Sequence, residues 1–280
     1  MAKANANGIE LEYEVLGDED GVPLLLIMGL GAQLVAWDVQ LCEAFADRGF
    51  KVVRYDNRDI GLSTKFPPGA PYTVADMADD AAGLLDALQI PAAHVVGASM
   101  GGMIAQELAI RHPGRVLTLT SIMSTTGEPG VGVPTAEAMD ALVTPPPLER
   151  EAYLDHAVRI ARVIQGDSPE FPFDEERARM RAAEAYDRSF NPQGTANQLA
   201  AVLASAPRTE RLRDLDVPAL VIHGSIDVLV TPSGGEATAA AIPGAEHLVI
   251  EGMGHSLPPM AWPRVVEAVT SLASRASVEA

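Results

Sequence analysis

The amino-acid sequence predicts an α/β fold, in which helices cover both faces of a mostly parallel sheet. Short apolar runs with the length of buried strands alternate along the chain with longer stretches at helical spacing. This alternation stops between residues 124 and 208, where strand signals vanish and glycine, proline and mixed charge become frequent. The chain is therefore expected to form one core from residues 1–123 and 209–280, with a helical insertion at residues 124–208.

The N-terminal part of the chain predicts two strands, a helix and a third strand. Residues 9–15 alternate apolar with acidic or polar side chains, which is typical of a half-exposed antiparallel strand, and the turn at residues 17–21 makes an edge hairpin. Residues 22–28 are continuously apolar, as expected for a strand covered on both faces, and the run ends in a glycine-rich loop. A helix at residues 35–49 and a strand at residues 51–55 follow.

The rest of the core continues this order. Thr73 and Asp76 have the spacing of a capping box, which predicts a helix that runs to Leu88. The remaining strands are expected at residues 94–96, 116–122, 218–223 and 247–250, and the remaining helices at residues 103–111, 234–242 and 263–273.

Composition and charge narrow the class of partner. The chain has 280 residues, 48% of them hydrophobic, and its 20 Lys and Arg stand against 38 Asp and Glu. The formal net charge of -18 repels phosphate backbones and anionic lipid surfaces, so we expect neither a nucleic-acid nor a membrane partner. Because no stretch fits a signal peptide or a membrane span, we expect a cytoplasmic protein, with a homo-oligomer left open.

Cysteine and histidine give no sign of a metal or cofactor site. The single cysteine, Cys42, rules out an internal disulfide and a multi-cysteine metal site. Its place in an apolar helical pattern indicates a buried structural thiol, with a nucleophilic thiol as the alternative. The spacing of His112, His156 and His247 does not fit a site of two histidines and one carboxylate, so no metal is expected.

The stretch with the clearest chemistry is Gly97-Ala98-Ser99-Met100-Gly101, which lies between a predicted strand and a predicted helix. A sharp turn there holds the serine in a strained conformation with its hydroxyl exposed, and only glycine lets neighbouring backbone come close enough. The first N–H groups of the helix have no intrahelical partner and favour negative charge at the turn. Ser99 is therefore the candidate nucleophile.

Two further loops at the carboxyl ends of predicted strands carry an acid, Asp227, and a histidine, His255. A serine hydroxyl needs a base within hydrogen-bond reach, and this is the role expected of His255. A carboxylate on the other ring nitrogen fixes the imidazole and stabilises its charged form, which is the role expected of Asp227. Asp80 and Glu128 remain as alternatives for the acid.

The negative oxygen formed by serine attack needs two aimed hydrogen-bond donors. The backbone N–H of Met100 is the first candidate, and the loop after the strand at residues 22–28 is expected to supply the second from Leu30. Removal of one such donor typically lowers the rate on the order of 100-fold or more.

Several residues at or just beyond predicted strand ends are expected to line the substrate pocket. They are Met28, Gly29, Met123 and Met253. Methionine is flexible and polarizable, so these side chains favour a roomy, apolar pocket that accepts irregular shapes. The alternative is that they are ordinary core residues.

Other polar residues have structural explanations. Asp56 and Arg58 are expected to brace their loop, and His94 and His223 lie within strand runs, where they would be packed or hydrogen-bonded. The charge run at residues 174–179 is expected to be a solvated helix face. Glu175 and Arg179, and likewise Glu184 and Arg188, have the four-residue spacing of surface ion pairs.

Five segments taken together resemble the α/β-hydrolase superfamily. They are LLLIMGLGA, YDNRDIGLS, HVVGASMGG, VIHGSIDVLVTP and EGMGHSLP. The resemblance implies an eight-stranded, mostly parallel sheet, a helical cap after the sixth strand, and a hydrolase of esters or related acyl compounds that needs no cofactor. Many members have histidine where Met28 stands, and Met-Gly at this place is similar to aclacinomycin methylesterase-like hydrolases.

The leading hypothesis is a serine esterase that cleaves a small-molecule carboxylic ester through an acyl-enzyme, for example a methyl ester of a larger apolar acid. A cofactor-free haloperoxidase or perhydrolase and an enol-lactonase can use the same triad, and they are the alternative enzymes. A non-catalytic ligand receptor on this fold is the alternative outside enzymes.

Overall fold

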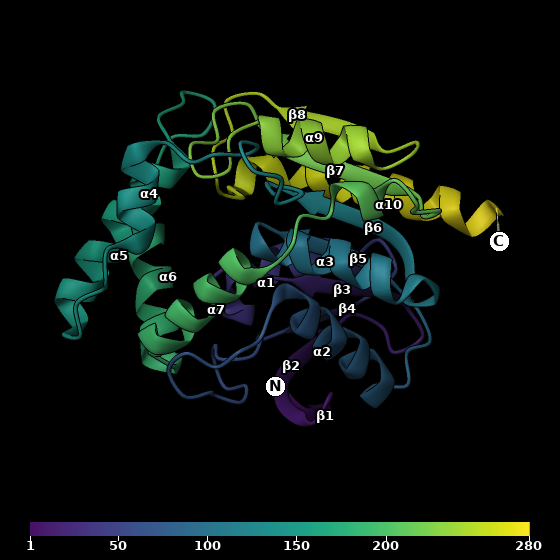
Figure 1. Ribbon diagram of the computed structural model, residues 1–280, viewed down its shortest axis with the longest axis horizontal. Coiled ribbons are helices and arrows are strands. Elements are labelled where there is room, and N and C mark those ends of the chain that lie inside the picture. The colour runs from purple at the N-terminus through teal and green to yellow at the C-terminus, as the bar shows by residue number, and fades with distance from the viewer. Residues whose placement is uncertain (280) are drawn as a thin grey trace.

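The computed structural model describes residues 1–279 and contains one eight-stranded sheet with the order β1-β2-β4-β3-β5-β6-β7-β8 (Figure 1). Strands β3 to β8 pair in parallel, and β2 pairs antiparallel with β1 and with β4. The mostly parallel, eight-stranded sheet expected from the sequence is therefore confirmed. The strands are β1 (Ala2–Ala6), β2 (Ile9–Leu16), β3 (Val22–Ile27), β4 (Phe50–Tyr55), β5 (Ala93–Ala98), β6 (Val116–Ile122), β7 (Ala219–Gly224) and β8 (Glu246–Ile250).

Helices cover the sheet on both faces, and the sheet separates two hydrophobic cores. Side chains of α1 (Val39–Ala46) and α10 (Trp262–Glu279) pack into one core. Side chains of α2 (Val74–Ala87), α3 (Met100–Arg111) and α9 (Ser233–Ala241) pack into the other. Strand β3 contributes alternate residues to the two cores, which explains why its sequence is continuously apolar.

The segment between β6 and β7 is helical. It contains α4 (Ala136–Val143), α5 (Arg150–Gln165), α6 (Glu175–Arg188) and α7 (Pro192–Ala204), and the short α8 (Thr209–Leu212) follows before β7. Figure 1 shows α4 to α7, in teal and green, gathered beside the sheet. The insertion after β6 is thus confirmed. The division into a core of residues 1–123 and 209–280 and a cap of residues 124–208 is our proposal for the domain organisation.

The predicted edge hairpin is wrong in its partner. Strand β2 does not pair with β3, because β4 lies between them in the sheet. Its hairpin partner is β1, which the sequence analysis missed because alanine, lysine and asparagine are uncommon in strands. The overlooked signal is Asn7-Gly8, since φ is positive at both residues, 49° and 78°, and this pair is the preferred two-residue hairpin turn.

The helix expected at residues 35–49 is interrupted. A short 3-10 helix at Leu34–Ala36 ends at Trp37, whose backbone is extended, and α1 begins after Asp38. The Asp38 side chain accepts the backbone N–H of Gln40 and so caps α1. The second half of the prediction is correct, and the interruption places Trp37 and Asp38 beside the cavity described below.

Two local predictions are confirmed. The capping box forms at the start of α2, where the carboxylate of Asp76 accepts the Thr73 backbone N–H at 2.7 Å. Cys42 is buried in the core, and burial raises the pKa of its thiol to about 12, so it has no thiolate character near neutral pH.

Among residues 1–279, no helix has both the length and the apolar character to cross a bilayer.

Candidate active site

Ser99 lies at the sharp turn between β5 and α3. Its backbone is strained, with φ 58° and ψ -122°, a region that residues other than glycine rarely adopt. The flanking glycines are required by close backbone contacts. A Cβ atom on Gly97 would lie 2.1 Å from the carbonyl oxygen of Gly101, and one on Gly101 would lie 2.1 Å from that of Ile27. The turn expected around Ser99 is therefore present.

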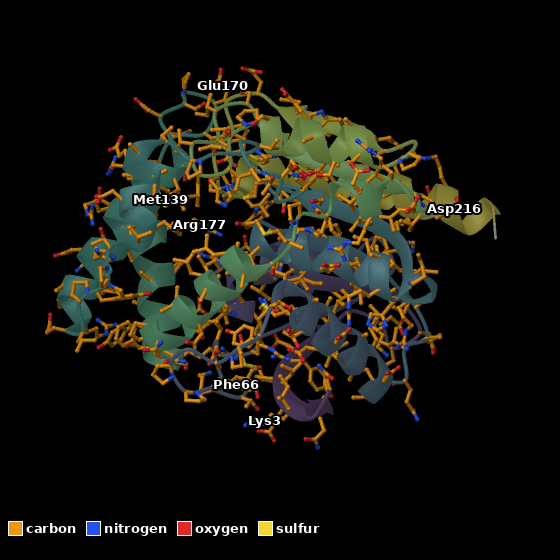
Figure 2. The ribbon with its side chains drawn as sticks, viewed as in Figure 1. Lys3, Phe66, Met139, Glu170, Arg177 and Asp216 are labelled. Atoms are coloured by element: carbon orange, nitrogen blue, oxygen red, sulfur yellow. The ribbon has the colours of Figure 1, made fainter. Side chains whose placement is uncertain are left out.

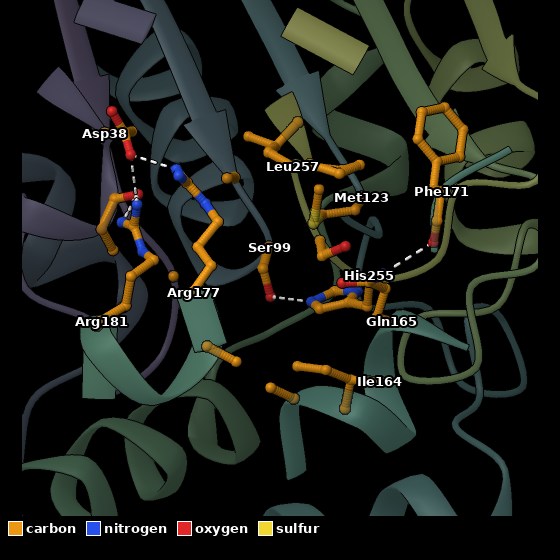
Figure 3. A pocket seen from close by; sticks show the side chains of 18 of the residues that line it. Asp38, Ser99, Met123, Ile164, Gln165, Phe171, Arg177, Arg181, His255 and Leu257 are labelled. Atoms are coloured by element: carbon orange, nitrogen blue, oxygen red, sulfur yellow. Dashed lines mark hydrogen bonds and ion pairs between the residues drawn. The ribbon is translucent and has the colours of Figure 1, made fainter. Parts of the chain in front are cut away.

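The structure brings Ser99, His255 and Asp227 into one line of hydrogen bonds. The distance between Ser99 Oγ and His255 Nε2 is 2.9 Å (Figure 3). The distance between His255 Nδ1 and Asp227 Oδ2 is 2.7 Å. The carboxylate and the imidazole are both buried. Hydrogen bonding to Asp227 favours the tautomer with the proton on Nδ1, which leaves Nε2 free to accept the serine proton.

The Asp227 carboxylate is held in place from both of its oxygens. Oδ1 accepts the backbone N–H groups of Leu229 and Val230, each at 2.9 Å, while Oδ2 faces His255. Burial raises the pKa of this carboxyl group, but the charges and hydrogen bonds of His255 and His223 outweigh burial and lower it to about 2. Asp227 is therefore ionised across the usual working range of pH.

His223 and His94 have structural partners, as expected. The His223 Nε2 lies 2.8 Å from the backbone oxygen of Val230, at the end of the loop that carries Asp227. The His94 Nδ1 lies 2.9 Å from the hydroxyl of Thr118 on the neighbouring strand.

Asp56, Arg58 and Asp80 also have structural roles. Asp56 accepts the backbone N–H groups of Leu34 and Leu62 at 2.7 and 2.8 Å, so it joins two loops. Arg58 donates to both oxygens of Asp80 at 2.6 Å. Asp80 therefore pairs with an arginine rather than with His255.

Glu128 likewise lies outside the hydrogen-bonded line. It is exposed, and its Oε2 accepts the Thr209 hydroxyl at 3.0 Å. Asp227 is the carboxylate that the structure places against His255.

The loop after β3 runs past Ser99. A Cβ atom on Gly29 would lie 3.0 Å from the Cβ of Ser99, so the two segments of the chain are in contact there. Within residues 1–279, the backbone N–H of Leu30 has no protein acceptor, and that of Met100 lies in the first turn of α3, where no intrahelical acceptor exists. Both candidate oxyanion donors expected from the sequence are thus unpaired and close to Ser99.

A cavity of about 700 Å³ opens above Ser99 and His255 (Figure 3). Its wall is mainly apolar and is built from both the core and the insertion. Met28, Gly29 and Met123 line it, as expected. Further apolar lining residues are Leu30, Trp37, Leu142, Ile160, Ile164, Phe171, Phe173, Leu257 and Trp262.

The expectation for Met253 needs correction. Its side chain is 0% exposed and belongs to the core that packs against α10, and it is not part of the cavity wall. Its backbone oxygen lies 2.0 Å from the position that a Cβ on Gly224 would take, so the segment after β8 packs against the end of β7. Position at a strand end does not decide which way a side chain points.

The sequence analysis missed an ionic cluster in the cavity wall. Arg177 and Arg181, one turn apart on α6, both donate to Oδ2 of Asp38, the second at 2.9 Å, and Arg177 also lies over the Trp262 ring. Asp174, which caps α6, lines the same region. The two arginines are balanced by two carboxylates, so the wall has no surplus charge.

The prediction that the charge run is a solvated face is therefore wrong for Arg177. The expected ion pairs four residues apart are also wrong. Arg179 pairs with Glu151 of α5, and Arg188 pairs with Asp56 of the core, rather than with the glutamate one turn before each. The signal was ambiguous because all faces of α6 carry charge, and only tertiary packing decides which face meets the core.

Three comparisons with known proteins agree with the fold. Residues 22–258 match the sequence model of the alpha/beta hydrolase fold family. Rhodomycin D methylesterase DauP of Streptomyces sp. (strain C5) is 33% identical over 270 residues, which cover 89% of this chain and 90% of that relative.

Two solved structures are similar over almost their whole length. The enol-lactonase of Burkholderia xenovorans LB400 has a TM-score of 0.75 at 27% identity. The match covers 99% of this chain and 100% of the enol-lactonase chain. The meta-cleavage product hydrolase CumD of Pseudomonas fluorescens IP01 has a TM-score of 0.80 at 23% identity, and the match covers 99% of this chain and 98% of the CumD chain. At this identity the similarity bears on the fold alone. The chain belongs to the α/β-hydrolase fold family.

Proposed function

We propose that the protein is a serine esterase, with Ser99 as the nucleophile, His255 as the general base and Asp227 as the residue that orients it. The observation that carries this proposal is the continuous line of hydrogen bonds from the Ser99 hydroxyl to the Asp227 carboxylate at the floor of the cavity. A serine hydroxyl is a weak nucleophile near neutral pH, and this arrangement supplies the base that it needs.

The reaction has two halves that use the same groups. Ser99 Oγ attacks the ester carbonyl carbon while His255 Nε2 takes the hydroxyl proton, and the backbone N–H groups of Leu30 and Met100 stabilise the resulting oxyanion. The C–O bond to the alcohol breaks and His255 returns the proton to the leaving oxygen. Water, deprotonated by His255, then attacks the acyl-enzyme, and the carboxylic acid and free Ser99 are released.

The cavity favours a neutral ester of a large apolar acid. Its volume far exceeds that of a small alkyl group, its wall is mainly apolar, and its ionic cluster is balanced in charge. A small leaving alcohol, such as methanol, agrees with the similarity to a rhodomycin D methylesterase. In this proposal, the cap closes over the acyl group.

We expect turnover of p-nitrophenyl esters to rise from the acetyl to the hexanoyl or a ring-bearing acyl group, because each buried methylene contributes about 0.8 kcal/mol to binding. The measurement is kcat/KM across the series at fixed ionic strength, followed by the methyl esters of the preferred acids. A sharp preference for acetyl over every larger acyl group would contradict the proposed pocket.

An enol-lactonase is the second candidate, since an enol-lactonase structure is similar to this chain over its whole length. A lactone is an internal ester, so the same attack opens its ring and the alcohol stays attached to the acid. Release of a free alcohol from methyl esters, with no ring opening of a lactone panel, would favour the esterase over this candidate.

A further inference from the structure

Gln198, on helix α7 of the insertion, bonds directly to the loop that carries Leu30. Its side chain is 0% exposed. Oε1 accepts the backbone N–H of Gly31 at 2.9 Å, and Nε2 donates to the backbone oxygen of Arg58 at 2.9 Å. The two halves of the amide are thus matched by one donor and one acceptor of the core.

Residues 29–32 form a tight turn, and Gln198 bonds to one of its peptides. Ala32 N–H donates to the Gly29 oxygen at 3.2 Å, and φ is positive at Gly31 but not at Leu30, which defines a type II turn. Because C=O and N–H of one peptide point in opposite directions, the bond from Ala32 aims the Leu30 N–H to the other side of the turn. The bond to Gln198 fixes the next peptide, between Leu30 and Gly31.

The turn has little rigidity of its own. Two of its residues are glycines, which have the greatest conformational freedom of all residues. A flip of the peptide between Leu30 and Gly31 would convert the turn to type I and bring the Leu30 carbonyl toward Gln198 Oε1, where two acceptors repel. The insertion also packs against the turn, since a Cβ on Gly31 would lie 2.9 Å from Thr195.

We propose that Gln198 is a positioning residue for the oxyanion hole, which holds the turn so that the Leu30 N–H faces the carbonyl oxygen of the substrate. The proposal rests on the proposed esterase function. In this proposal, helix α7 acts on the catalytic machinery through the loop that carries Leu30, although none of its residues lines the cavity in the described structure.

Asn197, the preceding residue, provides a matched control. Its side chain is 3% exposed and is also fully engaged, but with the loop at residues 59–69. Nδ2 donates to Asp59 Oδ2 and to the Pro67 oxygen, and Oδ1 accepts the Gly69 N–H, each at 3.1 Å. Loss of this amide removes buried hydrogen bonds of the same kind without touching the turn at residues 29–32.

The experiment compares Gln198→Met with Asn197→Leu in the full chain. Two probes are used: an alkyl trifluoromethyl ketone, which adds to serine hydrolases as a tetrahedral oxyanion, and the corresponding secondary alcohol, which does not. Gln198→Met is expected to lose roughly 100-fold in kcat for p-nitrophenyl butyrate and in affinity for the ketone, with little change in KM or in affinity for the alcohol. Asn197→Leu is expected to lower the midpoint of thermal unfolding and to leave the ketone-to-alcohol affinity ratio unchanged.

Gln198→Glu keeps the test decisive if Gln198→Met fails to fold. A buried carboxyl group stays protonated more readily than an exposed one, and in that form it offers one acceptor and one donor, as the amide does. In mildly acidic buffer this variant is expected to keep the wild-type ketone affinity, and to lose it relative to the wild type as the pH rises and the carboxyl group ionises.

The proposal is overturned if Gln198→Met keeps the wild-type affinity ratio, or if Gln198→Glu loses ketone affinity at every pH. If the wild type neither binds the ketone nor hydrolyses the ester, the esterase proposal itself fails. If the wild type binds the ketone and hydrolyses the ester, and the Gln198 variants behave like the wild type, only the proposed role of Gln198 is removed.

Discussion

Replacement of Ser99 by alanine is expected to lower kcat/KM for a chromogenic ester by about 10⁴-fold or more. The hydroxyl is the only group of the site that can form the covalent bond to the acyl carbon in the proposed mechanism. Alanine occupies the same strained backbone without adding atoms, so the fold should be kept. The measurement is steady-state turnover of p-nitrophenyl butyrate, with circular dichroism to verify folding.

Ser124→Ala is the matched control for this variant. Ser124 is also a buried serine that follows a strand of the sheet, but its hydroxyl has no hydrogen-bond partner in the described structure and does not line the cavity. Turnover should stay at the wild-type level. Ester turnover by Ser99→Ala at a level close to that of Ser124→Ala would remove Ser99 from the mechanism.

Asp227→Asn is expected to lower kcat by about 10³- to 10⁴-fold, with the geometry of the site largely preserved. The amide can still accept from Leu229 and Val230 through Oδ1, but its NH₂ group then faces His255 and favours the wrong tautomer of the imidazole. Because the pKa of Asp227 is lowered to about 2, the wild type carries this negative charge at every pH of a usual assay.

The pH profile of kcat separates this role from a merely structural one. No acid limb due to Asp227 is expected in the wild type above about pH 4. Asp80→Asn serves as the control, since Asp80 is a second buried aspartate that pairs with Arg58 and not with His255. It should lower the free energy of unfolding by about 3 kcal/mol or more while leaving the shape of the profile unchanged. If the two variants lost the same activity, Asp227 would have no special role.

Much of the site could be predicted from the sequence because its parts are encoded locally. The Ser99 turn needs glycines at two fixed positions, and those glycines stand in the sequence beside it. Asp227 and His255 each follow a recognisable strand at the same edge of a parallel sheet, so the fold itself brings them together. The order of the strands was therefore enough to predict that Asp227 and His255 lie close together.

The pocket wall could not be predicted in the same way. Arg177 and Arg179 lie two residues apart in one charged helix, yet one lines the cavity and the other pairs with α5. Gln198 lies in an unremarkable helical stretch, and its function arises only where α7 meets the loop after β3. These roles depend on how the insertion packs on the core, which no local pattern records.

The most direct measurement is covalent labelling with a fluorophosphonate, followed by mass spectrometry of the proteolytic peptides. Figure 3 shows Ser99 and His255 in the cavity, and Figure 2 shows the side chains of the structure as a whole. Ser99 Oγ should displace fluoride, so that the peptide containing Ser99 carries the phosphonyl group, and both Ser99→Ala and His255→Ala should lose the label. Labelling of a different residue, or unchanged ester turnover without the His255 imidazole, would contradict the proposed mechanism.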